Sequence, residues 1–169
     1  MRLAFILCFL LVQVGLVSAQ QNEFTSAKIT FEFPSKNVKG SIEGFESQSQ
    51  IDWKVPSNSI FKGSVASATL DTNNGLRNWS LRGSRYFNVK DYPKIVYSSR
   101  AVRKIGTSWM VEGDLMIKGN TKSVSFEFKE DNGKLIGKAS LYSSDFGIKI
   151  KKSREDNLVL IKLELELVR

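Results

Sequence analysis

The stretch that decides the fold is Val159-Leu160-Ile161-Lys162-Leu163-Glu164-Leu165-Glu166-Leu167. From Ile161 onward, apolar and charged residues alternate strictly. A period of two is typical of a β-strand that has one dry face and one solvated face. A helix would instead group its apolar residues three and four positions apart. This stretch therefore predicts a strand whose Ile and Leu side chains face a core.

The same pattern, less regular, recurs along most of the chain. Further strands are predicted at Lys28–Phe33, Val38–Phe45, Ile51–Val55, Ser59–Leu70, Lys94–Val102, Trp109–Ile117, Ser123–Phe128 and Leu135–Tyr142. Asn132-Gly133 is a strong hairpin signal, because both residues tolerate positive φ. Eight or nine antiparallel strands tend to close on themselves and so remove their free edges. We therefore predict an all-β, closed antiparallel, lipocalin-like barrel of about eight strands.

One segment, Asn74–Ser84, departs from the strand pattern and predicts a short helix. Asn73 or Asn74 can cap it with its side-chain oxygen. Leu76, Trp79 and Phe87 follow at roughly helical spacing, so we expect an amphipathic helix that buries its apolar face over one end of the sheet. Pro93 ends the insert before the next strand begins.

The period-two rule predicts which side chains point into the barrel. These are Ile29, Phe31, Phe33, Val111, Leu115, Ile117, Val124, Phe126, Phe128, Ile161, Leu163 and Leu165. Such side chains can fill the interior themselves or surround an apolar guest, and in small barrels most inward residues are simply core. Glycines on the strands, such as Gly40, Gly113 and Gly137, either leave volume for a guest or bend the strands.

Several motifs resemble those of the YceI-like family. They are Asp71-Thr72, Arg77-Asn78 with Leu81, Tyr86-Phe87, Tyr92-Pro93-Lys94-Ile95, Val111–Lys122 and Ser144-Asp145-Phe146-Gly147-Ile148. Together they span nearly all of the chain beyond residue 19. The chain departs from the family pattern at Asn37, Asn78 and Ser143, where His, Asp and Arg are more usual.

The resemblance implies a secreted, lipocalin-like barrel that holds a polyisoprenoid or another long-chain apolar lipid. It favours a guest over a self-filled core, so the inward residues above become lipid contacts, together with Trp79, Phe87 and Tyr97. At the mouth, Asp71, Asn74, Arg77 and Asn78 are candidates to contact a lipid head group. For Asp71 and Asn74 the alternative is simple helix capping.

Residues 1–19 have the pattern of a signal peptide. Arg2 precedes an apolar run that ends in the small residues Val17-Ser18-Ala19, and this run is too short to span a membrane. We expect cleavage after Ala19, a single domain over residues 20–169, and a periplasmic or secreted protein without stable membrane insertion. Leu7 before Cys8 argues against a lipid anchor. Pairing of two such chains is left open.

Composition excludes several kinds of chemistry. The chain has no His, and its one Cys lies in the leader, so Cys–His, Ser–His and His-based zinc sites are excluded beyond residue 19. An enzyme would need paired carboxylates, as in a carboxylate-based hydrolase, or a Ser–Lys pair, and Asp71, Glu112, Asp114 and Asp145 show no spacing that marks a carboxylate pair. We therefore expect no catalytic residue, cofactor or metal site.

The net charge of +8 leaves one more alternative open. A basic surface with Trp53, Trp79 and Trp109 could serve a surface or nucleic-acid-binding module, but such modules need aromatics interleaved with cations on one face. Only Lys149–Arg154 is a dense basic cluster. A solvated surface is the simpler interpretation, and no nucleic acid is expected as a partner.

Overall fold

The computed structural model describes residues 24–168, and the expected signal peptide lies outside these residues. Nine strands form one sheet: β1 Phe24–Phe33, β2 Val38–Ile42, β3 Glu46–Ser47, β4 Lys62–Ala66, β5 Lys94–Ile105, β6 Ser108–Ile117, β7 Asn120–Asp131, β8 Lys134–Tyr142 and β9 Leu158–Leu167. The α-helix α1 spans Gly75–Arg82. Short 3₁₀ turns are η1 Pro34–Lys36, η2 Pro56–Asn58, η3 Ser67–Thr69, η4 Ser143–Phe146 and η5 Glu155–Asn157.

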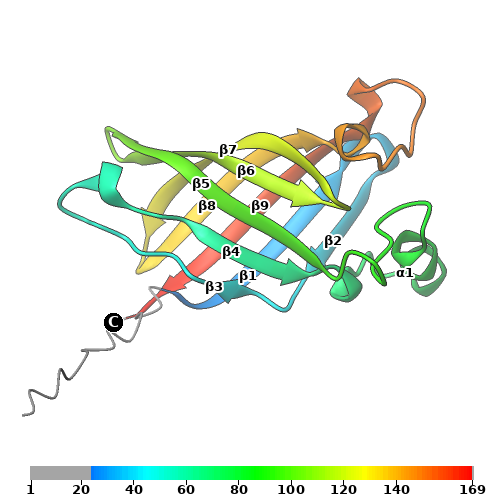
Figure 1. The fold of residues 1–169 in the computed structure, drawn as a ribbon, viewed down its shortest axis with the longest axis horizontal. Helices are drawn as coiled ribbons and strands as arrows, with labels where there is room; N and C mark the ends of the chain where they lie inside the picture. Colours follow the sequence, from blue (N-terminus) through cyan, green and yellow to red (C-terminus); the bar gives the residue numbers. More distant parts are fainter. Residues whose placement is uncertain (1–23, 169) are drawn as a thin grey trace, which may run out of the picture.

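The sheet curls into a half-barrel, with α1 at one end (Figure 1). Its strand order is β2-β1-β9-β8-β7-β6-β5-β4-β3, and all neighbours pair antiparallel. The all-β class and the single inserted helix are thus confirmed. The sheet has nine strands and two ends, β2 and β3, where a closed ring of about eight strands was predicted. Ser41 and Asp71 exchange backbone hydrogen bonds of 2.9 Å near the first end.

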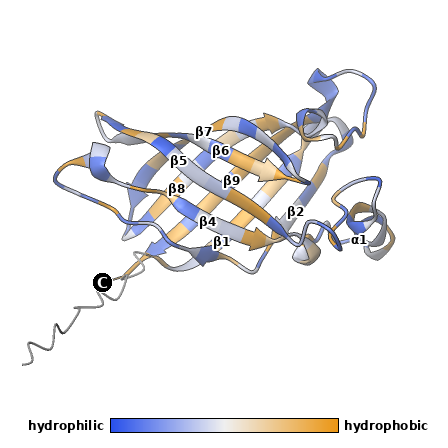
Figure 2. Cartoon of the chain, in the orientation of Figure 1, coloured by the Kyte–Doolittle hydropathy of each residue, from blue (hydrophilic) through white to orange (hydrophobic). Residues whose placement is uncertain are grey.

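β9, the strand predicted most clearly, lies between β1 and β8. Its inward residues face those of β1 across the ladder, with Leu163 opposite Ile29 and Ile161 opposite Phe31. This register keeps one apolar face continuous from strand to strand, because side chains in register share a face of the sheet. Figure 2 shows hydrophobic and hydrophilic residues alternating along these central strands.

Local chemistry explains where strand predictions failed. The segment Ile51–Val55 is a loop, because an Asp52 carboxylate oxygen accepts hydrogen bonds from the backbone N–H groups of Lys54 and Val55, at 2.9 and 2.8 Å. Such a side-chain bond competes with the ladder for backbone donors. The predicted hairpin at Asn132-Gly133 is confirmed, and both residues have positive φ.

Strand glycines seat aromatic rings instead of leaving space for a guest. A Cβ on Gly137 would lie 2.3 Å from the ring of Phe128, its partner in the β7–β8 register. A Cβ on Gly40 would lie 2.4 Å from the ring of Phe31, and one on Gly113 would lie 2.7 Å from the ring of Tyr97. Backbone oxygens are nearer still at two of these positions, with Asp71 O 2.3 Å from a Cβ on Gly40 and Ser98 O 2.4 Å from one on Gly113, so close approach of a ring or of a neighbouring backbone accounts for glycine at all three.

Candidate functional site

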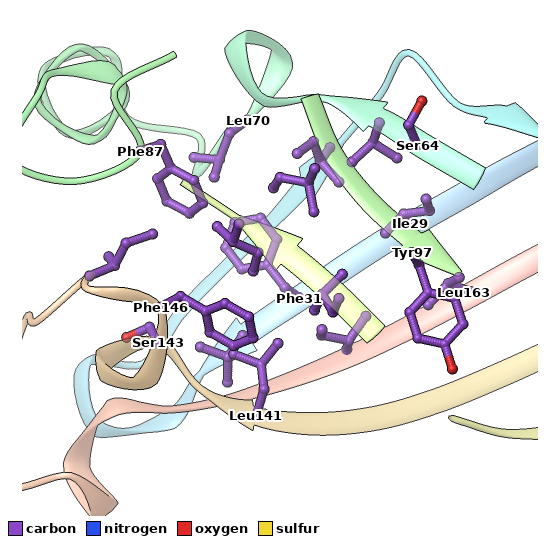
Figure 3. Close-up of a pocket in the computed structure, with 18 of the residues that line it drawn as sticks. Ile29, Phe31, Ser64, Leu70, Phe87, Tyr97, Leu141, Ser143, Phe146 and Leu163 are labelled. Atoms are coloured by element: carbon purple, nitrogen blue, oxygen red, sulfur yellow. The ribbon is translucent and has the colours of Figure 1, made fainter. Parts of the chain in front are cut away.

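The interior of the half-barrel contains a cavity of about 560 Å³. Two separate groups of buried apolar residues border it, a larger one on the central strands and a smaller one formed by Ile42, Val65 and Leu70. In Figure 3, Leu70 and Phe87 face Phe146 and Leu141 across the cavity. Its lining is overwhelmingly apolar, and its volume lies within the range of roughly 300–1,000 Å³ typical of small-molecule sites.

Most inward residues predicted from the period of two line this cavity. They are Ile29, Phe31, Phe33, Leu115, Ile117, Phe126, Phe128, Ile161, Leu163 and Leu165, together with Phe87 and Tyr97. Several of them, including Ile29, Phe31 and Leu163, are only half-buried although they point inward. The interior is therefore not filled by its own side chains.

Val111 and Val124 are buried but do not reach the cavity. Tyr97 covers them, because its hydroxyl donates to the backbone carbonyls of both, at 3.0 and 3.2 Å. Burial raises the pKa of the Tyr97 phenol, so this hydroxyl stays protonated at neutral pH and holds the ring against β6 and β7. The part of Tyr97 that faces the cavity is the apolar edge of its ring.

Trp79 was predicted to contact a lipid inside the barrel, and that prediction is wrong. Its side chain is 76% exposed on the outer side of α1, and Leu76 beside it is 78% exposed. The helix is turned the other way from the orientation expected, because buried Asn78 and half-buried Arg77 and Leu81 face the barrel. Hydrogen bonds to Asn78, described below, fix this orientation.

Asn78 ties α1 to the preceding loop. Its side-chain oxygen accepts hydrogen bonds from the Thr72 backbone N–H at 2.9 Å and from the Thr72 hydroxyl at 2.7 Å, and its amide donates to Asp71 at 2.7 Å. Hydrogen bonds from Asn78 and from the Asn73 backbone lower the pKa of Asp71. Asp71 and Asn78 thus form a structural network beside the cavity.

Asn74, the predicted cap, accepts a hydrogen bond of 2.9 Å from the backbone N–H of Arg77. Its capping role is confirmed, and its side chain does not line the cavity. Of the four residues predicted to contact a head group, only Arg77 belongs to the lining. The role of all four in lipid recognition stays a prediction.

The end of the barrel remote from α1 is closed by aromatic rings. Phe61 stacks on Phe128 with ring centroids 5.1 Å apart and packs against Phe24 at 6.3 Å. All three side chains are buried. Next to them, Trp53 meets Trp109 edge-on at 5.3 Å. These contacts seal the cavity on that side.

Exposed or polar lining residues lie at the α1 end and also on β4, where exposed Lys62 and half-buried Ser64 line the cavity. Lys36 of η1, Ser80 of α1 and Ile150 after η4 line the cavity and are exposed, and Arg77 adds a half-buried cation. Ser143 also lines the α1 end; it is buried, and its hydroxyl has no hydrogen-bond partner among the described residues. The cavity thus combines an apolar body with polar groups at its open end.

Several lining residues were missed from sequence, notably Phe24, Phe45, Phe61, Leu70, Tyr86, Leu141, Phe146 and Ile148. Most lie outside the strands that alternate cleanly. Phe146 and Ile148 were quoted only as part of a family motif, and their burial shows that the motif packs the end of the barrel. A period-two signal cannot find residues on turns.

The carboxylates considered for catalysis lie away from the cavity and are engaged elsewhere. Glu112 pairs with Arg103, Asp114 with Arg100 at 3.4 Å, and Asp145 with Arg154. None of them lines the cavity. Within residues 24–168, no cluster of acidic, His or Cys side chains could hold a metal ion. The three Trp residues are also divided between the two ends of the barrel, so they do not form one stacking face.

The fold and the site define an antiparallel half-barrel around an apolar cavity. The family model described as "YceI-like domain" matches residues 18–168, and the chain belongs to that family. This confirms the resemblance found in the sequence motifs. Among the described residues, none of the helices is long and apolar enough to cross a membrane.

Protein YceI of Escherichia coli is 28% identical over 115 residues, which are 66% of this chain and 60% of that protein. A UPF0312 protein of Photorhabdus laumondii is 34% identical over 85 residues, 50% of this chain and 44% of that protein. The aligned region thus covers less than two thirds of either relative.

Two solved structures share the fold. BcnA of Burkholderia cenocepacia superimposes with a TM-score of 0.74 at 19% identity, covering 86% of this chain and 98% of that chain. A polyisoprenoid binding domain from Saccharophagus degradans, implicated in plant cell wall breakdown, gives 0.57 at 9% identity, covering 87% and 97%. At these identities the likeness establishes architecture.

Proposed function

We propose that this protein is a non-catalytic carrier that holds the chain of a polyisoprenoid or similar long-chain lipid inside the half-barrel. The observation that carries the proposal is the apolar cavity of about 560 Å³. Membership of the YceI-like family supports it, as does the shared fold with a protein described as a polyisoprenoid binding domain. The predicted lipid contacts that line the cavity, from Ile29 on β1 to Leu165 on β9, are the residues proposed to touch the chain.

The energetics suit a long apolar ligand. Each CH₂ group removed from water contributes about 0.8 kcal/mol, so a five-carbon isoprene unit contributes roughly 4 kcal/mol before ordering costs. Association costs on the order of 4–15 kcal/mol in lost freedom. A few isoprene units are therefore enough for tight binding, whereas a short ligand is not.

We place the polar end of the lipid at the α1 end of the cavity. Lys36 and Arg77 supply positive charge there, and the Ser143 hydroxyl supplies an unused hydrogen-bonding group. A polar head group at this position reaches water, while the aromatic rings at the other end meet the tail. Asp71 and Asn78 act in this proposal by positioning α1.

We further propose that the mature chain, residues 20–169, is a single exported domain. The support is the leader-like pattern of residues 1–19, which matches a cleavable signal peptide in charge, length and small terminal residues. The half-barrel would then work outside the cytoplasm without stable membrane insertion.

Filling the cavity tests the carrier function. Leu163 lines the cavity, whereas Leu160 on the same strand is 42% exposed on the outer face. We expect Leu163→Trp to weaken binding of cis-parinaric acid by roughly tenfold or more, since the indole occupies space the chain needs. Leu160→Trp should bind as the unaltered protein does.

Thermal unfolding of each variant would show whether Leu163→Trp still folds, and Ile29→Phe is a milder filler of the same cavity. Equal fluorescence titrations for all folded variants would refute the carrier function. The same would follow if the unaltered protein, stripped of bound lipid, took up no probe.

A further inference from the structure

Helix α1 exposes two large apolar residues, Leu76 and Trp79, and buries the polar Asn78. Leu76 and Trp79 are three positions apart, so they lie on the same face of the helix, and they are 78% and 76% exposed. Asn78 faces the barrel and is held there by hydrogen bonds to Thr72 and Asp71. The orientation of α1 is therefore fixed, and it presents a Leu and a Trp to the outside.

The charge of the molecule is unevenly divided between its two ends. The loops at the α1 end are residues 34–37, 71–93, 118–119 and 143–157; those at the far end are 48–61, 106–107 and 132–133. The first group carries ten Lys and Arg against five Asp and Glu, and the second carries one of each. The excess positive charge of the loops thus lies at the same end of the half-barrel as Leu76 and Trp79.

Four of the five acidic residues at the α1 end are already engaged, one of them being Glu155, which accepts a hydrogen bond of 2.8 Å from the Ser153 hydroxyl. Asp71 accepts a hydrogen bond from the Asn78 amide, Asp91 accepts one of 2.8 Å from Asn88, and Asp145 pairs with Arg154. Lys149, Lys151 and Lys152 form no ion pair within residues 24–168. Asn157 fixes the loop that carries them, because its amide oxygen accepts hydrogen bonds from the backbone N–H groups of Ile150 and Lys151.

From this combination we propose that the face formed by Leu76, Trp79 and the basic loops beside them docks onto a lipid bilayer that carries anionic head groups. Trp is suited to the interfacial region of a bilayer, where its amphipathic ring meets both hydrocarbon and water. Short helices with apolar residues on one side and Lys or Arg around them bind such surfaces in the interfacial plane. Anionic lipids complement the uncompensated cations.

If the carrier function proposed above holds, docking through this face would help lipid transfer. Ser80 and Arg77, on the same helix, line the open end of the cavity. When Leu76 and Trp79 enter the interface, the mouth of the cavity faces the bilayer, and a lipid chain passes between membrane and barrel without crossing water. Docking itself does not require the carrier function.

Co-sedimentation with vesicles tests the docking. We expect the mature protein to bind vesicles of phosphatidylcholine mixed with phosphatidylglycerol, to bind pure phosphatidylcholine vesicles less, and to be released by high salt. Leu76→Ser with Trp79→Ser should lower the partition coefficient roughly tenfold or more, since each large side chain loses its burial. Ile105→Ser is the matched control, because Ile105 is an equally apolar side chain, 63% exposed, at the far end.

Two kinds of result would contradict the docking proposal. If the double variant binds vesicles as well as the unaltered protein, or if Ile105→Ser weakens binding as much, the docking face is wrongly placed. If no vesicle is bound and sedimentation velocity shows that Leu76 and Trp79 instead control self-association, the face pairs with a second copy of the chain. Uptake of cis-parinaric acid by the double variant should be unchanged, so failure of docking and failure of the carrier function are told apart.

Discussion

The two ends of the half-barrel are built from the same strands but differ in how they finish. At the far end, Phe24, Phe61 and Phe128 stack and close the interior. At the α1 end, the strands give way to η1, α1 and η4, whose Lys36, Arg77 and Ser143 leave polar groups around an opening. The comparison shows that one sheet can end in stacked rings on one side and, on the other, in turns that bury Phe146 and Ile148 but leave polar groups around an opening.

The largest expected difference between the ends is in stability. Phe128→Ala removes a buried ring from the closed end and should lower the free energy of unfolding by about 3–5 kcal/mol. Phe87→Ala at the open end should cost less than about 2 kcal/mol, because its half-buried ring already faces open space. Urea unfolding would measure both. Equal losses would mean that the α1 end is packed as tightly as the closed end.

A smaller loss of stability is expected at the strand glycines that contact aromatic rings. Gly137→Ala places a Cβ 2.3 Å from the Phe128 ring and should destabilise the protein by about 1–3 kcal/mol, the usual cost of overpacking. Gly75→Ala is the matched control, because nothing lies within 4 Å of the added methyl group. Thermal denaturation of the pair compares them. An unaffected Gly137→Ala variant would show that the ring has room to move.

The next expected effect is a local loss of stability at the α1 end. Asn78→Ala removes the acceptor of the Thr72 N–H and hydroxyl and should cost about 1–3 kcal/mol locally, as expected for buried polar groups left unpaired. Amide hydrogen exchange should speed up in residues 71–83 and stay unchanged in β7 and β8. If exchange also rises in those strands, α1 and the closed end unfold as one unit and the two ends are not independent.

The smallest effect is a response to acid at the loop after β8. Arg154 donates hydrogen bonds to both carboxylate oxygens of Asp145, at 2.9 and 2.6 Å, and thereby lowers the pKa of Asp145 below its ordinary value of 3.8. A lowered folded-state pKa means that the stabilisation is complete above the ordinary value and is lost as the pH falls through the folded-state pKa. Hydrogen exchange in residues 143–157 should therefore rise only under strongly acidic conditions. Asp145→Asn should abolish that acid step, and an acid step that persists would assign it to another group.

The sequence predicted the strands of the molecule better than its turns and its helix. Alternation on β1, β7 and β9 identified Phe31, Phe128 and Leu163 correctly as inward, because side chains in a strand keep a period of two. Trp79 was misplaced, since helical spacing alone does not say which face of a short helix is held against the barrel. That choice depends on the hydrogen bonds of Asn78, which only the folded structure shows.

Neither the closure of the sheet nor the shape of its interior could be predicted from the sequence. For the glycines at positions 40, 113 and 137 the sequence left bending and free volume open, and the structure shows a third reason, the close approach of neighbouring atoms. Whether the barrel is filled or hollow depends on how the aromatic rings pack, because a list of inward residues is the same in both cases. The family resemblance favoured a hollow interior, and the cavity agrees with it.

Native mass spectrometry of the mature protein, purified from bacteria without added lipid, tests the carrier function most directly. The expected result is one additional mass per chain that organic solvent releases as a long, hydrocarbon-rich amphiphile, and that is lost in Leu163→Trp but kept in Leu160→Trp. A protein that carries no additional mass, and that binds no cis-parinaric acid although correctly folded, would contradict the proposed function.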